Sequence, residues 1–240
     1  MHIGIIQCDD VLDQYQPEFG NYPAMLQNLF LSVDPELRFT VYAAHKMELP
    51  EHLDECDAYL STGSIRSAYD ELDWITQLIE FLRQVDHAEK KFVGICFGHQ
   101  LFAKAFGGLV EKSPHGWGVG ISFNDIIEPQ PWMQPFQSKM DLIVSHQDQI
   151  TQLPEDTKVL ARSDFCDYYM LQRGNHILTM QGHPEFSVGY ITMLANSRLE
   201  RIGASRIRQA MTSLKAPADD RLMTQWILNF MRNEISEDKG

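Results

Sequence analysis

The chain has 240 residues, 44% of them hydrophobic, and its formal net charge at pH 7 is −13. This length and apolar content allow a full core within one domain and exclude a disordered chain. The acidic balance argues against nucleic acid as a partner, because phosphates would be repelled. The densest basic cluster lies in a helical pattern that also holds an acidic residue, and we expect it to be a solvated face: Arg198, Arg201, Arg206 and Arg208.

Strand and helix patterns alternate in the first half of the chain, which predicts a parallel sheet with helices on both faces. From residue 118 strands follow in quick succession, so an antiparallel extension is expected, and helical spacing returns from Val188 to Ile202 and around Leu222 to Phe230. We therefore predict a flavodoxin-like, doubly wound α/β fold in a single domain, with a catalytic core over 1–186 and C-terminal helices over 187–240 packed on it. Strands are expected at 3–6, 38–43, 57–61, 92–95, 121–127, 141–145, 158–163, 168–172 and 176–180, and the earlier helices at 22–33, 71–85 and after Cys96.

Four cysteines are present, with no Cys-x-x-Cys spacing and no His-Glu-x-x-His zinc motif. A reduced compartment fits this usage best. The chain shows no secretory signal pattern and no apolar run near 18 residues. We therefore expect a cytoplasmic protein with no membrane partner and no metal or organic cofactor.

Cys96 lies between a buried strand that ends at Ile95 and a helical pattern that begins directly after it. Gly94 and Gly98 remove side chains on either side of this turn, as in the nucleophile elbow of serine hydrolases. Amide groups at a helix N-terminus favour a thiolate over a thiol. The pattern predicts a presented nucleophile, although a small buried cysteine in a tight turn would look the same.

A nucleophilic cysteine needs a base, and the base needs a group that orients it. A short apolar strand at residues 177–180 runs into Gly182 and then delivers His183, Pro184 and Glu185. Pro184 stops the strand and stiffens the turn, so the imidazole and the carboxylate can project together. A solvated turn is the alternative, but the pairing with Cys96 favours a catalytic dyad.

Together, Gly-x-Cys-x-Gly-His-Gln around Cys96 and His-Pro-Glu at His183 resemble the signature of the class I glutamine amidotransferases, over roughly residues 3–186. The resemblance implies that Cys96 is the nucleophile, His183 the general base and acid, and Glu185 the residue that orients His183. Phe97 stands where the family usually has leucine. Because the family uses the backbone amide at this position, the resemblance still makes Phe97 an oxyanion donor.

Two further segments look like elements of the same family. Thr62-Gly63-Ser64 ends a strand, and the resemblance makes the Gly63 amide the second oxyanion donor. Gln100, on the first turn of the elbow helix, is a substrate contact that can donate and accept hydrogen bonds. The strand-end residues Ser145, His146, Gln147 and Asp148 resemble the element near the substrate's α-amino and carboxylate groups, although His146 could equally be an ordinary packed histidine.

The implied reaction is attack of Cys96 on the γ-amide of glutamine, giving a γ-glutamyl thioester, ammonia and then glutamate. One interpretation makes the chain the glutaminase of a two-protein system in which the ammonia passes to a separate synthase subunit. A second is a self-sufficient γ-glutamyl peptide hydrolase, although the acidic residues between Thr62 and Trp74 are displaced relative to that branch. A third is a redox-sensing or stress-related flavodoxin-like protein, which would leave His-Pro-Glu unexplained.

Overall fold

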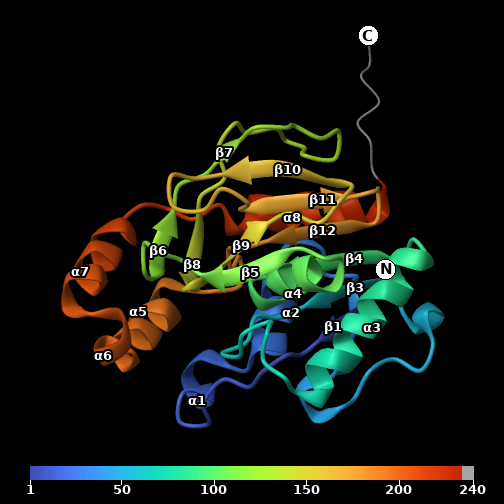
Figure 1. Cartoon of the computed structure of the whole chain (residues 1–240), viewed down its shortest axis with the longest axis horizontal. Helices are drawn as coiled ribbons and strands as arrows, with labels where there is room; N and C mark the ends of the chain where they lie inside the picture. Colours follow the sequence, from blue (N-terminus) through green and yellow to red (C-terminus); the bar gives the residue numbers. More distant parts are fainter. Residues whose placement is uncertain (234–240) are drawn as a thin grey trace.

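An eight-stranded sheet runs through the computed structural model, which describes residues 1–233 (Figure 1). Five neighbouring strands are parallel, and three more extend the sheet antiparallel. This arrangement confirms the predicted mainly parallel α/β fold with its antiparallel extension. In sheet order the strands are β2 (Arg38–Tyr42), β1 (His2–Ile6), β3 (Ala58–Ser61), β4 (Lys91–Ile95), β12 (Ile177–Met180), β11 (Met170–Arg173), β10 (Thr157–Arg162) and β7 (Asp125–Ile126).

Helices cover both faces of the sheet, because adjacent side chains of a strand point to opposite faces. In β3, Leu60 belongs to the core shared with α2 (Tyr22–Val33) and α8 (Asp220–Arg232). Its neighbour Tyr59 belongs to the core shared with α3 (Asp73–His87) and α4 (Phe97–Ala105). Before residue 60 the short helices are α1 (Gln16–Phe19) and two 3-10 turns, Ala44–Lys46 and Leu53–Glu55.

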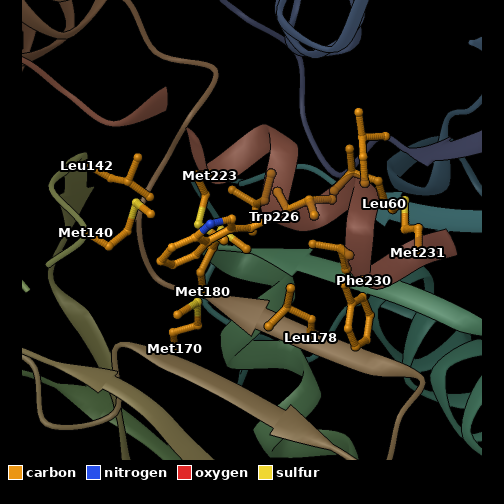
Figure 2. Close-up of a cluster of buried hydrophobic side chains, with 14 of the residues drawn as sticks. Leu60, Met140, Leu142, Met170, Leu178, Met180, Met223, Trp226, Phe230 and Met231 are labelled. Atoms are coloured by element: carbon orange, nitrogen blue, oxygen red, sulfur yellow. The ribbon is translucent and has the colours of Figure 1, made fainter. Parts of the chain in front are cut away.

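Methionine and aromatic side chains fill the core beneath α8. Trp226 is fully buried, and Figure 2 shows it surrounded by sulfur-containing side chains that include Met180 and Met223. Its Nε1 donates to the Pro135 backbone oxygen over 3.0 Å, so the one polar atom of the ring is satisfied. The predicted C-terminal segment, 187–240, thus supplies core residues as far as Met231. Its last part, 234–240, lies outside the described residues.

The region after residue 108 departs from the prediction. The strand expected at 121–127 is two strands in different sheets, namely β6 (Gly118–Ser122), which pairs with β8 (Leu142–His146), and β7. Buried Asn124 separates them, because its side-chain amide donates to the backbone oxygens of Ser122 and Met140. β5 (Leu109–Lys112) and β9 (Asp148–Gln152) form a further two-stranded sheet that was not predicted, because neither alternates regularly between apolar and polar side chains.

The helix expected from Val188 to Ile202 is interrupted at Arg198, which separates α5 (Val188–Ser197) from α6 (Leu199–Ile202). Gly203 follows with φ of 88° and leads into α7 (Ala204–Ser213). These three helices lie at one end of the molecule, beside β6 and β8 (Figure 1). Within residues 1–233 no helix has the length and apolarity that crossing a membrane requires.

Candidate active site

The three segments singled out in the sequence meet at one edge of the sheet. β3, β4 and β12 are parallel neighbours, with Ser61 opposite Gly94 and Met180 opposite Ile95. Each strand is followed at its carboxyl end by one of the predicted site segments. Open α/β sheets build their ligand sites at this edge. The topology therefore brings together Gly63, Cys96 and His183.

Cys96 lies in a strained turn between β4 and α4. Its backbone has φ of 50° and ψ of −94°, which residues with a Cβ rarely adopt. Its amide donates to the Met180 backbone oxygen over 2.8 Å, which ties the turn to β12. A Cβ at Gly98 would lie 1.8 Å from Ser61 Oγ, and one at Gly94 would lie 2.8 Å from the Gly98 carbonyl carbon. Both glycines are therefore required by the close approach of β3, β4 and α4.

His99, the histidine of the same motif, is a buried residue that connects α4 to β12. It is fully buried, and its Nδ1 lies 2.8 Å from Thr179 Oγ1 on β12. Burial lowers the pKa of His99 to about 3, so the ring is neutral. The elbow helix is thus tied to the strand that leads to His183.

His183 is oriented from two sides. Its Nδ1 lies 2.7 Å from Glu185 Oε1, and both side chains are buried. The Phe186 ring stacks on the imidazole, with centroids 3.9 Å apart and planes inclined by 9°. A Cβ at Gly63 would lie 3.6 Å from both His183 Nε2 and Cys96 Cβ. The second imidazole nitrogen and Cys96 thus border the same small pocket, where a base for Cys96 would lie.

Two opposing effects set the ionisation of His183. Burial by itself would lower the pKa of His183, because the protonated ring loses its hydration. The charge of Glu185, together with the charge and hydrogen bond of Cys96, outweighs this and raises the pKa of His183 from 6.5 to about 10. The imidazole thus carries its proton at neutral pH, next to the sulfur.

Two backbone amides border Cys96 at the positions expected for an oxyanion site. Phe97 is the first residue of α4, where helix geometry leaves the amide without an intrahelical acceptor. Gly63 follows β3, and a Cβ there would lie 2.7 Å from His183 Cε1, so this position must lack a side chain. Within residues 1–233 neither amide donates a hydrogen bond to another residue. Both are available to a negative oxygen formed beside the sulfur.

Gln181, which was not predicted, contacts the sulfur directly. Its Nε2 donates to Cys96 Sγ over 3.4 Å, and the side chain is fully buried. Its Oε1 in turn accepts from Gln100 Nε2, which also donates to the Asp148 backbone oxygen, over 3.1 and 2.8 Å. The available signal was an amide residue directly after the apolar run of β12. Because the Gln100 amide nitrogen donates to both residues, Gln100 also positions Gln181 and Asp148.

A cavity of about 130 Å³, here called the inner cavity, opens beside Cys96. Its lining includes all four residues predicted to bind substrate, namely Gln100, His146, Gln147 and Asp148. Asp148 is held by Ser67, whose hydroxyl donates to Asp148 Oδ2 over 2.6 Å. The structure therefore brings the four predicted residues to the same cavity as the cysteine.

Two roles were considered for His146, namely a packed histidine and a residue of the substrate site, and the structure is consistent with both. It is a packed histidine, because the ring is buried and its Nδ1 lies 3.1 Å from the Asp148 backbone oxygen. Burial, with the nearby charges of His183 and Arg206, lowers the pKa of His146 to about 4. It also lines the inner cavity, where it offers a neutral ring.

The prediction that the basic cluster forms a solvated face is wrong for two of its four arginines. Arg201 and Arg208 are exposed, but Arg198 is half-buried and lines the inner cavity together with Arg201. Arg206 is also half-buried, and its Nε donates to the Trp117 backbone oxygen over 2.5 Å. The helical pattern was misleading because α5 ends at Ser197, and the break at Arg198 turns this side chain toward the site.

Residues 24–198, more than half of the chain, match the family model of class-I glutamine amidotransferases. The chain belongs to this family. The chain is 33% identical to gamma-glutamyl peptidase 3 of Arabidopsis thaliana over 141 residues, which cover 56% of the chain and 57% of that peptidase. It thus spans little more than half the length of this plant relative.

Other members of the glutamine amidotransferase family match over different lengths. A putative glutamine amidotransferase-like protein of Schizosaccharomyces pombe is 28% identical over 246 residues, covering 96% of the chain and 98% of the yeast protein. A glutamine-hydrolyzing GMP synthase subunit of Methanosarcina acetivorans is 32% identical over 126 residues, covering 52% of the chain and 65% of that relative. A glutamine amidotransferase structure from Thermotoga maritima has the same fold, with a TM-score of 0.76 at 18% identity over 96% of the chain and 98% of that structure.

Proposed function

We propose that the chain hydrolyses γ-glutamyl amide bonds through a thioester on Cys96. The observation that carries this proposal is the strained Cys96 turn facing the buried pair of His183 and Glu185. Strain of this kind persists only where the surrounding structure imposes it, and it is concentrated at active sites. The similarity to a gamma-glutamyl peptidase and to an amidotransferase-like protein adds support.

In the proposed reaction, the Cys96 sulfur attacks the γ-carbonyl carbon and the carbonyl oxygen becomes negative. The amides of Gly63 and Phe97 hold this oxygen. His183 donates its proton to the leaving nitrogen, so the C–N bond breaks and a γ-glutamyl thioester and a free amine remain. The neutral imidazole then takes a proton from water, whose oxygen attacks the thioester and releases glutamate from Cys96.

The glutamyl part of the substrate would occupy the inner cavity. Asp148, fixed by Ser67, offers a carboxylate to the substrate's α-ammonium group. His146 and Gln147 complete the same wall, and Gln100 holds the Asp148 backbone in place. A rigid wall of this kind holds the γ-carbonyl near the sulfur, which is where orientation contributes most to rate.

The direct test uses the purified chain alone, incubated with glutamine and with γ-glutamyl-alanine, while ammonia and glutamate are measured. Cys96→Ala should abolish both activities. Cys166→Ala is the matched control, because Cys166 is a buried core thiol whose burial raises its pKa to about 12. An affinity label for glutaminases should modify Cys96, whereas labelling of Cys8 or Cys166 with Cys96 spared would show that the nucleophile is misassigned.

A second candidate is a glutaminase that supplies ammonia to a separate synthase subunit, as the match to a glutamine-hydrolyzing GMP synthase subunit suggests. The chemistry at Cys96 would be the same, but the leaving group would always be ammonia. Weak glutamine hydrolysis that a synthase subunit stimulates would favour this candidate. Brisk cleavage of γ-glutamyl-alanine by the chain alone would favour the self-sufficient hydrolase.

A further inference from the structure

A second cavity, here called the outer cavity, lies between α5 and the loop that follows β1. Its volume is about 490 Å³, and half of the residues that line it are aromatic or aliphatic. Tyr22, Leu194 and Arg198 line it and also line a small pocket of about 20 Å³ that contains Cys96 and His183. The outer cavity is thus adjacent to the site on the imidazole side, and these three side chains form the wall between the two.

The position of His183 indicates which part of a substrate would lie toward the outer cavity. In the proposed reaction His183 protonates the leaving nitrogen, so any group attached to that nitrogen lies on the imidazole side of the sulfur. The small pocket has room for about one water-sized molecule, which is enough for ammonia. A larger leaving amine would have to continue past Tyr22 and Leu194 into the outer cavity.

Arg198 lies between the three cavities. Of the described residues, it alone lines the inner cavity, the small pocket and the outer cavity. Its Nη1 donates to Ser145 Oγ over 3.3 Å, and its guanidinium lies 5.9 Å from the centroid of the Trp117 ring. The Arg201 guanidinium also lies over the Trp117 ring, 5.4 Å from its centroid. The aromatic ring and the hydroxyl hold the Arg198 guanidinium between these cavities.

No described carboxylate pairs with Arg198. The two acids of the outer cavity have partners elsewhere, since Asp9 accepts from the Ile65 amide over 2.7 Å and Asp10 pairs with Lys46 at 3.1 Å. A half-buried guanidinium without a counter-ion is costly unless a ligand supplies the negative charge. In a chain with a net charge of −13, a half-buried guanidinium without a carboxylate partner indicates a site for an anion.

Building on the proposed function, we infer that Arg198 binds a carboxylate carried by the leaving amine, so that the preferred substrates are γ-glutamyl peptides with a free C-terminal carboxylate. The γ-glutamyl group occupies the inner cavity, and the amino acid or short peptide released from it occupies the outer cavity. Guanidinium and carboxylate match each other in shape and charge, which makes arginine suited to this task.

The test compares kcat/KM for γ-glutamyl-alanine and γ-glutamyl-alaninamide, which differ only in the terminal carboxylate. A charge-assisted hydrogen bond predicts a preference of about ten- to hundredfold for the acid in the wild-type chain. Arg198→Gln should bring the ratio close to one, mainly by raising KM for the acid, and Arg198→Lys should restore part of it. Arg208→Gln, an exposed arginine of α7, is the matched control and should keep the wild-type ratio.

Two results would overturn the inference while the proposed function stands. One is equal cleavage of the acid and the amide by the wild-type chain. The other is an Arg198→Gln variant that loses activity on both substrates to the same extent, which would place Arg198 on the shared γ-glutamyl part. If the wild-type chain cleaves neither peptide nor glutamine, the proposed function is wrong, and the inference falls with it.

Discussion

Replacing Glu185 by glutamine should move the alkaline limit of catalysis down to near neutrality. The pKa of His183 is raised to about 10 against the effect of burial, and Glu185 is one of the two charges responsible. Its carboxylate and the imidazole are both buried, so water screens them little. At a separation of about 4 Å between charge centres, an effective dielectric constant of about 20 gives about 4 kcal/mol, which corresponds to a change of about 3 in pKa.

Glu185→Gln keeps the size of the side chain and an oxygen that can accept from Nδ1, but it removes the charge. The assay is kcat for γ-glutamyl-alanine at saturating concentration from pH 5 to 11, because kcat reports groups in the enzyme–substrate complex. In the wild-type chain kcat should fall above about pH 10, where His183 loses the proton needed by the leaving amine. In Glu185→Gln the fall should begin near pH 7. An unchanged alkaline limit would refute the assignment of Glu185 as the group that keeps His183 protonated.

Unfolding gives a second measurement of the same interaction. A histidine whose pKa is higher in the folded chain than in the unfolded chain stabilises the fold when it is protonated. This contribution is fully present below the ordinary pKa of 6.5 and is lost as the pH rises through about 10. The free energy of unfolding of the wild-type chain should therefore decline between these pH values more steeply than that of Glu185→Gln. Parallel curves would contradict the expected pairing.

Gly98→Ala should cost about 1 to 3 kcal/mol of folding stability in urea unfolding, because the new Cβ would lie 1.8 Å from Ser61 Oγ. Adding Ser61→Ala should recover part of this loss, and a variant as stable as wild type would contradict the packing described. Gln181→Leu should lower kcat/KM by about ten- to hundredfold, because it removes a hydrogen-bond donor from the Cys96 sulfur. Alkylation of Cys96 by iodoacetamide at pH 7 should slow in parallel, and an unchanged alkylation rate would show that Gln181 does not act on the sulfur.

The Cys96 turn could be predicted from sequence because its constraints are local. Gly94 and Gly98 stand beside Cys96 in the chain, and the structure requires both glycines for the close approach of β3, β4 and α4. His183 and Glu185 are two residues apart, so the pair they form in the structure was already visible as a motif. Patterns of this kind can be recognised without knowing the tertiary contacts, because the residues that form them are close together in the sequence.

Arg198 and Gln181 could not be predicted in the same way, because their positions depend on contacts across the fold. Arg198 continues a helical pattern in the sequence, and only the break between α5 and α6 turns it over Trp117 and toward Ser145. Gln181 follows an apolar strand and reaches the sulfur only because β12 and β4 are neighbours in the sheet. Pairing between β5 and β9 is likewise tertiary, since neither segment has a strand pattern of its own.

The burial of Trp226 between α8 and the sheet has a consequence for how the chain is made. α8 spans residues 220–232, so the ribosome synthesises it after every strand of the central sheet. Until then α2 supplies only part of the cover for the sheet face that includes Leu60, Met180 and Leu178, and the apolar side chains that α8 will bury are open to other nascent chains and to chaperones. Completion of this core during translation therefore waits until α8 has left the ribosome.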